Sequence, residues 1–212
     1  MAHILVIGAS RGIGLACCKY ALDAGHSVRG FARSAADMTL PGAFQPMPGD
    51  ATQAGDLAPA LDGIDAVLLT LGIKAGVSML WSPVTLFSQA TQALVPLMEQ
   101  HGPDRLICVT GIGAGTSLSA LSLPERLTQN ALLGHAYRDK TRQEEIIRGS
   151  SLRWTLLRPT ILTNGRASGR VLVLRDPAKW RNGMVPRADV AQVAIDALGD
   201  NTLVGADPVV TR

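Results

Sequence analysis

A glycine-rich turn near the start of the chain constrains its fold more than any other feature. The sequence Gly8-Ala9-Ser10-Arg11-Gly12-Ile13-Gly14 follows a short apolar run that begins at His3, and it opens a segment, Gly12 to Ala24, in which apolar residues recur at helical spacing. Glycines allow a tight turn and let backbone N–H groups at the helix start approach a diphosphate closely. A strand, this turn and a helix in that order predict a dinucleotide cofactor. We expect it to be held by Gly8, Ser10, Arg11, Gly12, Ile13 and Gly14.

Strands and helices alternate along the rest of the chain. We expect further strands at Ser27–Ala32, Gln45–Pro48, Asp65–Gly72, Arg105–Thr110, Leu152–Leu157 and Arg170–Leu174, and helices at Ala54–Leu61, Pro83–His101, Pro124–Arg148 and Arg187–Leu198. Pro96 should kink or shorten its helix, and Gly134 is a candidate break in the next one. The alternation predicts an α/β fold, a doubly wound parallel sheet of the Rossmann type with helices on both faces. Residues 1–212 are expected to form a single domain with a small substrate-side region from about residue 159 to 212.

The end of the second predicted strand indicates which dinucleotide binds. NAD-specific folds usually place an acidic residue there, to bind the ribose 2′-hydroxyl group. This strand instead ends Phe31-Ala32-Arg33-Ser34, and no carboxylate follows until Asp37. Arg33 can pair with a 2′-phosphate and Ser34 can donate a hydrogen bond to it, and Arg11 is a second candidate for the same phosphate. The sequence therefore predicts NADP(H) as the cofactor rather than NAD(H).

Composition excludes several other classes of protein. The 212 residues are 47% hydrophobic and 17% charged, which suits a chain with a sizeable core, and the net charge is only +3. Because no run of lysine and arginine occurs, we expect no nucleic-acid partner. Cys17, Cys18 and Cys108 have no metal-ligand or disulfide spacing and are expected to be buried, so no metal site is predicted. A strand that starts at His3 leaves no room for a signal peptide, and no apolar run is long enough to cross a membrane, so the cytoplasm is the expected location.

Several short motifs occur in a fixed order along the chain: the glycine turn, Gly49-Asp50, Leu71-Gly72, Arg158-Pro159 and Pro186-Arg187-Ala188-Asp189-Val190-Ala191. Together they resemble the atypical short-chain dehydrogenase/reductase superfamily, and most closely its group of biliverdin-IXβ/flavin reductases and NmrA-like proteins. The resemblance covers essentially the whole chain. It implies adenine contacts from Asp50 and Ala51 and adenosine-ribose contacts from Leu71 and Gly72. It further implies that Thr110 and Gly111 lie beside the nicotinamide ribose and that Pro159, Thr160 and Ile161 lie near the carboxamide. Lys74, at the rim of the expected cleft, is a candidate for the cofactor phosphates or an anionic substrate.

The sequence departs from the catalytic residues of that superfamily, which are a serine, a tyrosine and a lysine four residues after the tyrosine. Lys140 stands where the lysine belongs, but the residue four positions earlier is Ala136, and Tyr137 is only three positions away. The place of the serine is taken by Gly111, and Thr110 is the adjacent hydroxyl. Lys140 is expected to hold the nicotinamide ribose, and Thr110 and Tyr137 are the remaining candidates for a catalytic hydroxyl group.

Three functions are compatible with these features. The first is an NADPH-dependent reductase that passes hydride to a planar acceptor such as a flavin, quinone or linear tetrapyrrole, because such a reaction needs ring orientation more than an acid. Its acceptor site would be formed by the loop from Gly111 to Ser122 and the region Met79-Leu80-Trp81. The second is a non-catalytic, NmrA-like redox sensor that binds NADP(H). The third is an epimerase or dehydratase acting on a nucleotide sugar, for which the residues after Pro159 leave little room.

Overall fold

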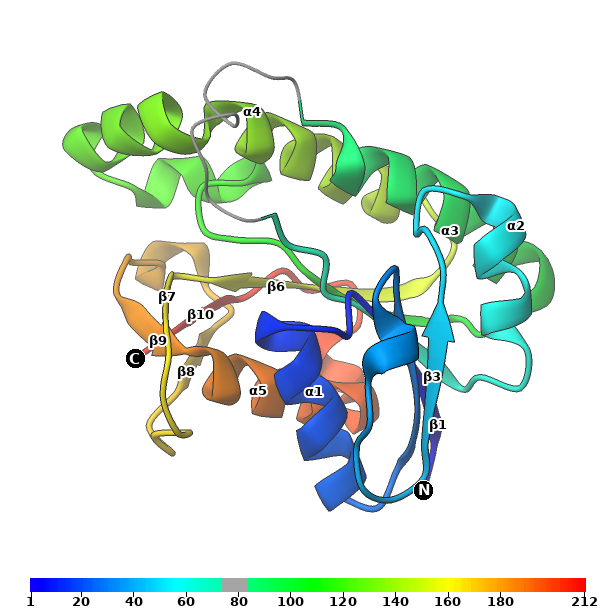
Figure 1. Cartoon of the computed structure of the whole chain (residues 1–212). Helices are drawn as coiled ribbons and strands as arrows, with labels where there is room; N and C mark the ends of the chain where they lie inside the picture. Colours follow the sequence, from blue (N-terminus) through cyan, green and yellow to red (C-terminus); the bar gives the residue numbers. More distant parts are fainter. Residues whose placement is uncertain (74–83) are drawn as a thin grey trace.

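The computed structural model describes residues 1–73 and 84–212. Its main sheet has eight strands in the order β3-β2-β1-β4-β5-β6-β10-β8, and neighbours pair in parallel except for β10 and β8 (Figure 1). The strands of this sheet are β1 (His3–Ile7), β2 (Ser27–Ala32), β3 (Phe44–Pro48), β4 (Ala66–Leu69), β5 (Arg105–Val109), β6 (Arg153–Pro159), β8 (Leu172–Leu174) and β10 (Val209–Thr211). Two further strands, β7 (Ile161–Thr163) and β9 (Met184–Pro186), form a small parallel sheet of their own. The predicted doubly wound α/β fold is confirmed.

Helices cover both faces of the main sheet (Figure 1). Helices α1 (Gly12–Asp23) and α5 (Arg187–Gly199) pack side by side on one face, and α2 (Ala54–Leu57), α3 (Leu86–His101) and α4 (Leu123–Arg148) lie on the other. Strand β1 shows why its sequence is continuously apolar: Ile4 and Val6 join the core beneath α1 and α5, whereas Leu5 and Ile7 join the core beneath α2, α3 and α4. Successive side chains of a strand point to opposite faces, so a strand covered on both sides is apolar throughout.

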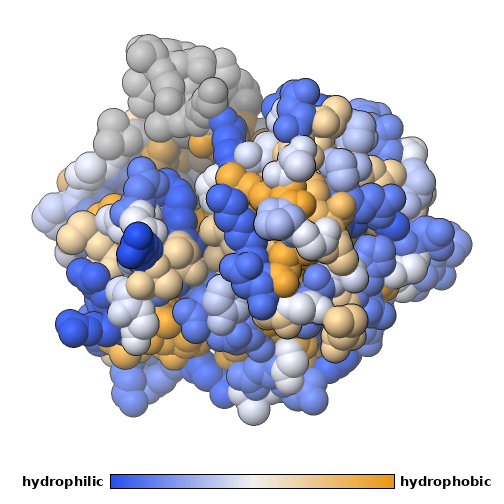
Figure 2. Space-filling model, turned by 60° about the horizontal axis from the view of Figure 1, so that its bottom comes forward, coloured by the Kyte–Doolittle hydropathy of each residue, from blue (hydrophilic) through white to orange (hydrophobic). Residues whose placement is uncertain are grey.

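The surface differs from this interior. On the face of the molecule shown in Figure 2, hydrophilic residues surround smaller areas of hydrophobic ones. The three cysteines are all buried, as expected from their apolar surroundings in the sequence. In the described ranges no helix is both long enough and apolar enough to cross a membrane.

The structure corrects one expectation about helices and narrows another. Helix α4 runs without interruption through Gly134 from Leu123 to Arg148. A single glycine costs a helix only about 1 kcal/mol relative to alanine, and here Ser122 and Glu125 form a capping box that stabilises its start. Helix α3 is not shortened by Pro96 and continues to His101. It begins at Leu86, whereas the predicted start at Pro83 lies outside the described residues.

The observed elements differ from the predicted ones in one further helix and in several short strands. The predicted helix Ala54–Leu61 is α2 followed by a 3₁₀ turn over Pro59–Leu61, because proline has no N–H group to continue the α-helical hydrogen bonds. Strands β7, β9 and β10, each of three residues, were not predicted. Strand β10 lies between β6 and β8, so the end of the chain completes the sheet.

Candidate functional site

The glycine turn between β1 and α1 is closely packed against the start of the segment that follows β4. Gly8 and Gly12 have positive φ angles of 88° and 60°, a conformation that favours glycine. A Cβ atom on Gly14 would lie 2.2 Å from the carbonyl oxygen of Gly8 and 2.6 Å from Oγ1 of Thr70. One on Gly8 would lie 2.9 Å from the carbonyl oxygen of Thr70. Glycine is therefore required at all three positions, either for its conformation or for its lack of a side chain.

This packing leaves the positive end of α1 open for an anion. Arg11, the residue before the helix, is extended and exposed, and within the described residues no side chain caps the first turn. Gly12 is exposed, Ser10 and Ile13 are half-buried, and Ile13 packs against the core. The N–H groups at a helix start carry a partial positive charge and bind phosphate well. The turn thus has the geometry that a diphosphate needs.

Arg33 and Ser34 lie directly after β2, at the same edge of the sheet, and both are exposed. Asp50 follows the adjacent strand β3, and its carboxylate accepts hydrogen bonds from the backbone N–H and hydroxyl groups of Thr52. These bonds, with a smaller contribution from the charge of Arg33, lower the pKa of Asp50 below its usual range. Ala51 is buried in the core beneath α2. Within the part of the chain that the structure describes, Arg33 forms no ion pair, so its guanidinium group is available to a phosphate group beside this turn.

The Arg33→Ala variant should lose affinity for NADPH by roughly ten- to a hundredfold and should bind NADH almost unchanged. One charge-assisted hydrogen bond is worth about 1.5–3 kcal/mol, and only NADPH carries the 2′-phosphate. Fluorescence titrations with both reduced cofactors measure the difference. Arg142→Ala, which removes an exposed arginine from α4, is the matched control. Equal losses for NADPH and NADH in the Arg33 variant would rule out this role.

At the end of β4, Thr70 is buried, and its hydroxyl group donates a 2.8 Å hydrogen bond to the carbonyl oxygen of Ile7. Leu71 is half-buried against the core, and Gly72 is exposed at the sheet edge. Thr70 was not predicted as a site residue, although it fixes the backbone on which the glycine turn rests. Lys74 and the predicted acceptor residues Met79, Leu80 and Trp81 lie outside the described residues.

Lys140 reaches from α4 to the end of β5. Its Nζ donates to the carbonyl oxygens of Thr110 at 3.0 Å and Val109 at 3.4 Å, and it lies 4.3 Å from the ring centre of Phe87. Burial lowers the pKa of Lys140 below that of an exposed lysine. An ammonium group has three N–H donors, so one remains for a cofactor hydroxyl group. This position suits the expected role of Lys140 at the nicotinamide ribose.

Tyr137 lies over Gly111, where the superfamily has its serine. A Cβ atom on Gly111 would be 2.9 Å from the Tyr137 hydroxyl oxygen, so the tyrosine fills space that a serine side chain would need. Burial raises the pKa of Tyr137, and a hydrogen bond with Gln129 opposes that shift. Within the described residues no hydrogen bond joins the Tyr137 hydroxyl group to Lys140, whose ammonium group donates to the carbonyl oxygens of Val109 and Thr110.

The hydroxyl group of Thr110 is also engaged. It donates a 2.8 Å hydrogen bond to Glu144, which is 1% exposed and forms a two-point ion pair with the fully buried Arg158 at 2.6 and 3.1 Å. Arg158 also pairs with Asp207 at 2.9 Å. Glu144 lies four residues after Lys140, on the same face of α4, and was not predicted. The four-residue spacing between Lys140 and Glu144 could have indicated that both side chains lie on one face of the helix.

The end of β6 completes this edge of the sheet. The carbonyl oxygen of Pro159 accepts the N–H of Ile112 at 3.0 Å, which fixes the loop after β5. Thr160 is buried and bonds through its hydroxyl group to Thr211, whereas Ile161 is 57% exposed. The predicted residues after β1, β2, β4, β5 and β6 thus meet at the carboxyl edge of one parallel sheet, where such folds bind their ligands.

Comparison with known proteins identifies the family. Residues 8–201 match the model of a family described as NAD(P)H-binding. The chain belongs to this NAD(P)H-binding family. The match confirms the predicted nicotinamide cofactor.

Solved structures with the same fold support this assignment. ChuY, an anaerobilin reductase from Escherichia coli O157:H7, is 26% identical and has a TM-score of 0.80, with 99% of this chain and 96% of ChuY covered. A short-chain dehydrogenase/reductase from Veillonella parvula in complex with NADP has a TM-score of 0.82 and covers 100% of this chain and 94% of its own. Because the two sequences are only 18% identical, this similarity shows a shared fold. A chloroplastic protein of Arabidopsis thaliana is 27% identical over 152 residues, and this stretch is 70% of the chain but only about half, 53%, of the plant protein.

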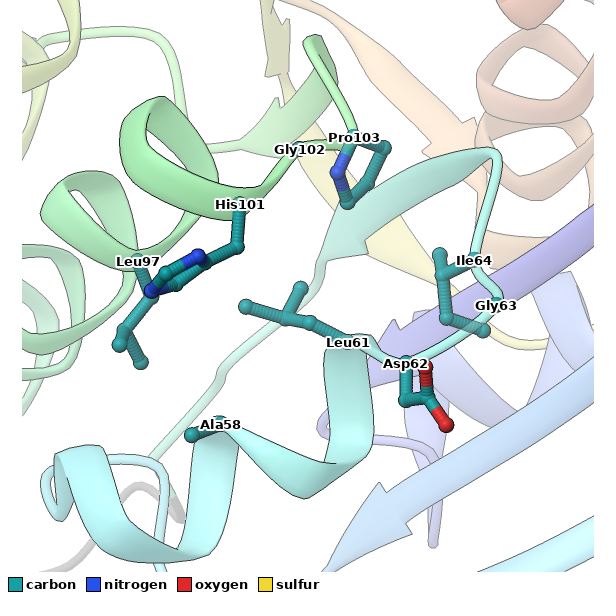
Figure 3. A pocket seen from close by; sticks show the side chains of 9 residues that line it. All are labelled: Ala58, Leu61, Asp62, Gly63, Ile64, Leu97, His101, Gly102 and Pro103. Atoms are coloured by element: carbon teal, nitrogen blue, oxygen red, sulfur yellow. The ribbon is translucent and has the colours of Figure 1, made fainter.

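A separate hollow lies away from the carboxyl edge of the sheet. It has a volume of about 320 Å³ and is lined by residues that precede β4 and β5, together with the end of α3, including Leu61, Ile64, Leu97 and His101 (Figure 3). Because the starts of parallel strands lie at the opposite edge from their ends, this hollow is remote from the glycine turn. We assign it no part in cofactor binding.

Proposed function

We propose that the chain is an NADPH-dependent reductase that transfers hydride to a planar acceptor such as a flavin, a quinone or a linear tetrapyrrole. The observation that carries this proposal is the state of the three hydroxyl positions beside Lys140. Position 111 is glycine, the Thr110 hydroxyl group donates to Glu144, and within the described residues no hydrogen bond joins Tyr137 to Lys140, whose ammonium group donates to backbone carbonyl oxygens. A carbonyl substrate needs an acid in its transition state, whereas reduction of an electron-poor ring needs chiefly orientation.

The residues of the chain have distinct roles in this proposal. The glycine turn binds the diphosphate, Arg33 and Ser34 bind the 2′-phosphate, and Lys140 holds the nicotinamide ribose. Pro159, Thr160 and Ile161 border the carboxamide. When bound, NADPH supplies a hydride from its nicotinamide C4 atom, and water supplies the proton that completes the two-electron reduction, with NADP⁺ and the reduced acceptor as products.

Exposed apolar side chains near the end of β5 and β6 suit a flat acceptor. Leu118, Leu123 and Leu127, on the loop after β5 and the start of α4, are 45%, 69% and 64% exposed. Ile161 and Met184 are paired across the small β7–β9 sheet, and each is 57% exposed. A 2.8 Å hydrogen bond from Asn182 to Glu125 connects these two regions. ChuY, which is similar to this chain, is an anaerobilin reductase. Among the planar acceptors, this similarity favours a bilin.

Oxidation of NADPH with a panel of acceptors tests the proposal. FMN, riboflavin, a quinone and biliverdin should each be offered, and at least one should accelerate NADPH oxidation well above the rate without acceptor. Tyr137→Phe should keep that rate within about threefold, because general acid catalysis, worth about 10²–10⁴-fold, is not required. A hundredfold loss in this variant, or no acceleration by any acceptor, would refute the proposal.

The alternative of an NmrA-like redox sensor is favoured by one feature, the missing Tyr-x-x-x-Lys arrangement. A sensor should bind both NADP⁺ and NADPH tightly and should turn over none of the four acceptors. The same panel therefore separates the two functions.

A further inference from the structure

We infer that Arg187, the first residue of α5, is a binding residue for the cofactor diphosphate, at the outer side of the glycine turn. This inference rests on the dinucleotide binding of the family and adds a contact from a different part of the chain, more than 170 residues beyond the turn. It concerns the diphosphate that NAD and NADP share. It is thus separate from the role of Arg33 at the 2′-phosphate.

The first argument is position. Helices α1 and α5 pack side by side on one face of the sheet (Figure 1). Their first residues, Gly12 and Arg187, lie close to each other. A Cβ atom on Gly12 would lie 4.0 Å from Nε of Arg187. Among the described residues other than Arg11, Ile13 and the backbone of α1, no further atom lies within that distance. The guanidinium group therefore borders the open side of the turn, where an anion bound by the helix start would lie.

The second argument is charge. Within residues 1–73 and 84–212, no carboxylate forms an ion pair with Arg187. The acid nearest in sequence, Asp189, is fully buried and accepts hydrogen bonds from the backbone and hydroxyl groups of Ser168 at 2.8 and 2.5 Å. A half-buried cation that the described residues do not neutralise is well suited to an anionic ligand.

The third argument is orientation. Nη1 of Arg187 donates a 2.7 Å hydrogen bond to the side-chain oxygen of Asn164. Asn164 directly follows β7, so it restrains the arginine from the neighbouring sheet. A guanidinium group has five N–H donors in a planar arrangement, and this bond uses one of them. The Nε edge that faces Gly12 stays available for a two-point contact with phosphate oxygens.

Binding measurements with NADP⁺, NAD⁺ and 2′-AMP test the inference, because 2′-AMP carries the 2′-phosphate but no diphosphate. Arg187→Gln should raise the Kd values for NADP⁺ and NAD⁺ together by about tenfold or more, and it should leave that for 2′-AMP within about twofold. Arg33→Ala should show the reverse pattern, with NADP⁺ and 2′-AMP weakened and NAD⁺ spared. Arg142→Gln on α4 is the matched control and should match the wild type for all three ligands.

Two further variants keep the test decisive if Arg187→Gln folds poorly. Arg187→Lys preserves the charge and should keep a Kd for NAD⁺ between those of the wild type and the glutamine variant. Asn164→Ala keeps Arg187 but removes the hydrogen bond that orients its guanidinium group. This variant should bind NADP⁺ and NAD⁺ a few-fold more weakly than the wild type. Unchanged affinity for both dinucleotides in the folded variants, or a parallel loss of 2′-AMP, would overturn the role of Arg187 while leaving the cofactor assignment intact. Absence of dinucleotide binding in the wild type would overturn both.

Discussion

The Gly14→Ala variant is expected to be less stable than the wild type by about 3 kcal/mol and to lose most of its affinity for NADP(H). The added methyl group would lie 2.2 Å from the carbonyl oxygen and 2.8 Å from the carbonyl carbon of Gly8, and 2.6 Å from Oγ1 of Thr70. Two of these atoms belong to the backbone and cannot move aside as a flexible side chain does. The turn must therefore open, and overpacking of this kind costs about 1–3 kcal/mol or more.

Urea unfolding and titration with NADP⁺ measure the two effects. Gly55→Ala is the matched control, because Gly55 lies in α2 and its added Cβ would meet no atom within 4 Å among the described residues beyond its chain neighbours and its own helix backbone. Alanine is a better helix former than glycine, so this control should be as stable as the wild type or more stable. If Gly14→Ala bound NADP⁺ like the control, the close packing of the turn would have no functional importance.

The second large effect is expected for Glu144→Gln, which should destabilise the protein by about 3 kcal/mol. The substitution removes the two-point partner of Arg158, which has no exposed surface, and leaves the partly exposed Asp207 as the counter-ion of this buried charge. Thr110 and the loop at Gly115 would be affected as well, since a Cβ atom on Gly115 would lie 2.4 Å from Oε2 of Glu144.

Urea unfolding of three variants tests this account. Glu145→Gln alters the next residue of α4, which is exposed, and should change stability by less than about 0.5 kcal/mol. The double variant Glu144→Leu with Arg158→Met should regain much of the lost stability, because apolar residues of similar volume often replace a buried ion pair without a net cost. A Glu144→Gln protein as stable as Glu145→Gln would show that the pair is unimportant.

Features set by local sequence were predictable. The apolar strands, the glycine turn and the arginine after β2 each have a pattern of their own, and the structure brings the predicted residues to one edge of the sheet. The order of motifs along the chain was enough to identify the family. The uninterrupted α4 was not predictable in the same way, because the glycine at position 134 is a local signal that the packing and capping of a long helix outweigh.

Features set by long-range contacts were not predictable. Arg187 is a surface residue in its own segment, and only the packing of α5 beside α1 brings it to the turn. The position of Tyr137 over Gly111 depends on how α4 is rotated against β5, which the spacing of residues on one helix does not fix. Likewise, a single sequence does not indicate that Glu144 of α4 joins Arg158 of β6 to Thr110 of β5.

The central claim is that backbone N–H groups at the start of α1 bind the diphosphate of a nicotinamide dinucleotide while Arg33 selects the phosphorylated ribose. Isothermal titration of the purified protein with NADP⁺ and, separately, with NAD⁺ tests it most directly. We predict saturable binding at one site per chain, with NADP⁺ bound at least tenfold more tightly than NAD⁺. Heats of dilution alone for both nucleotides would contradict the claim.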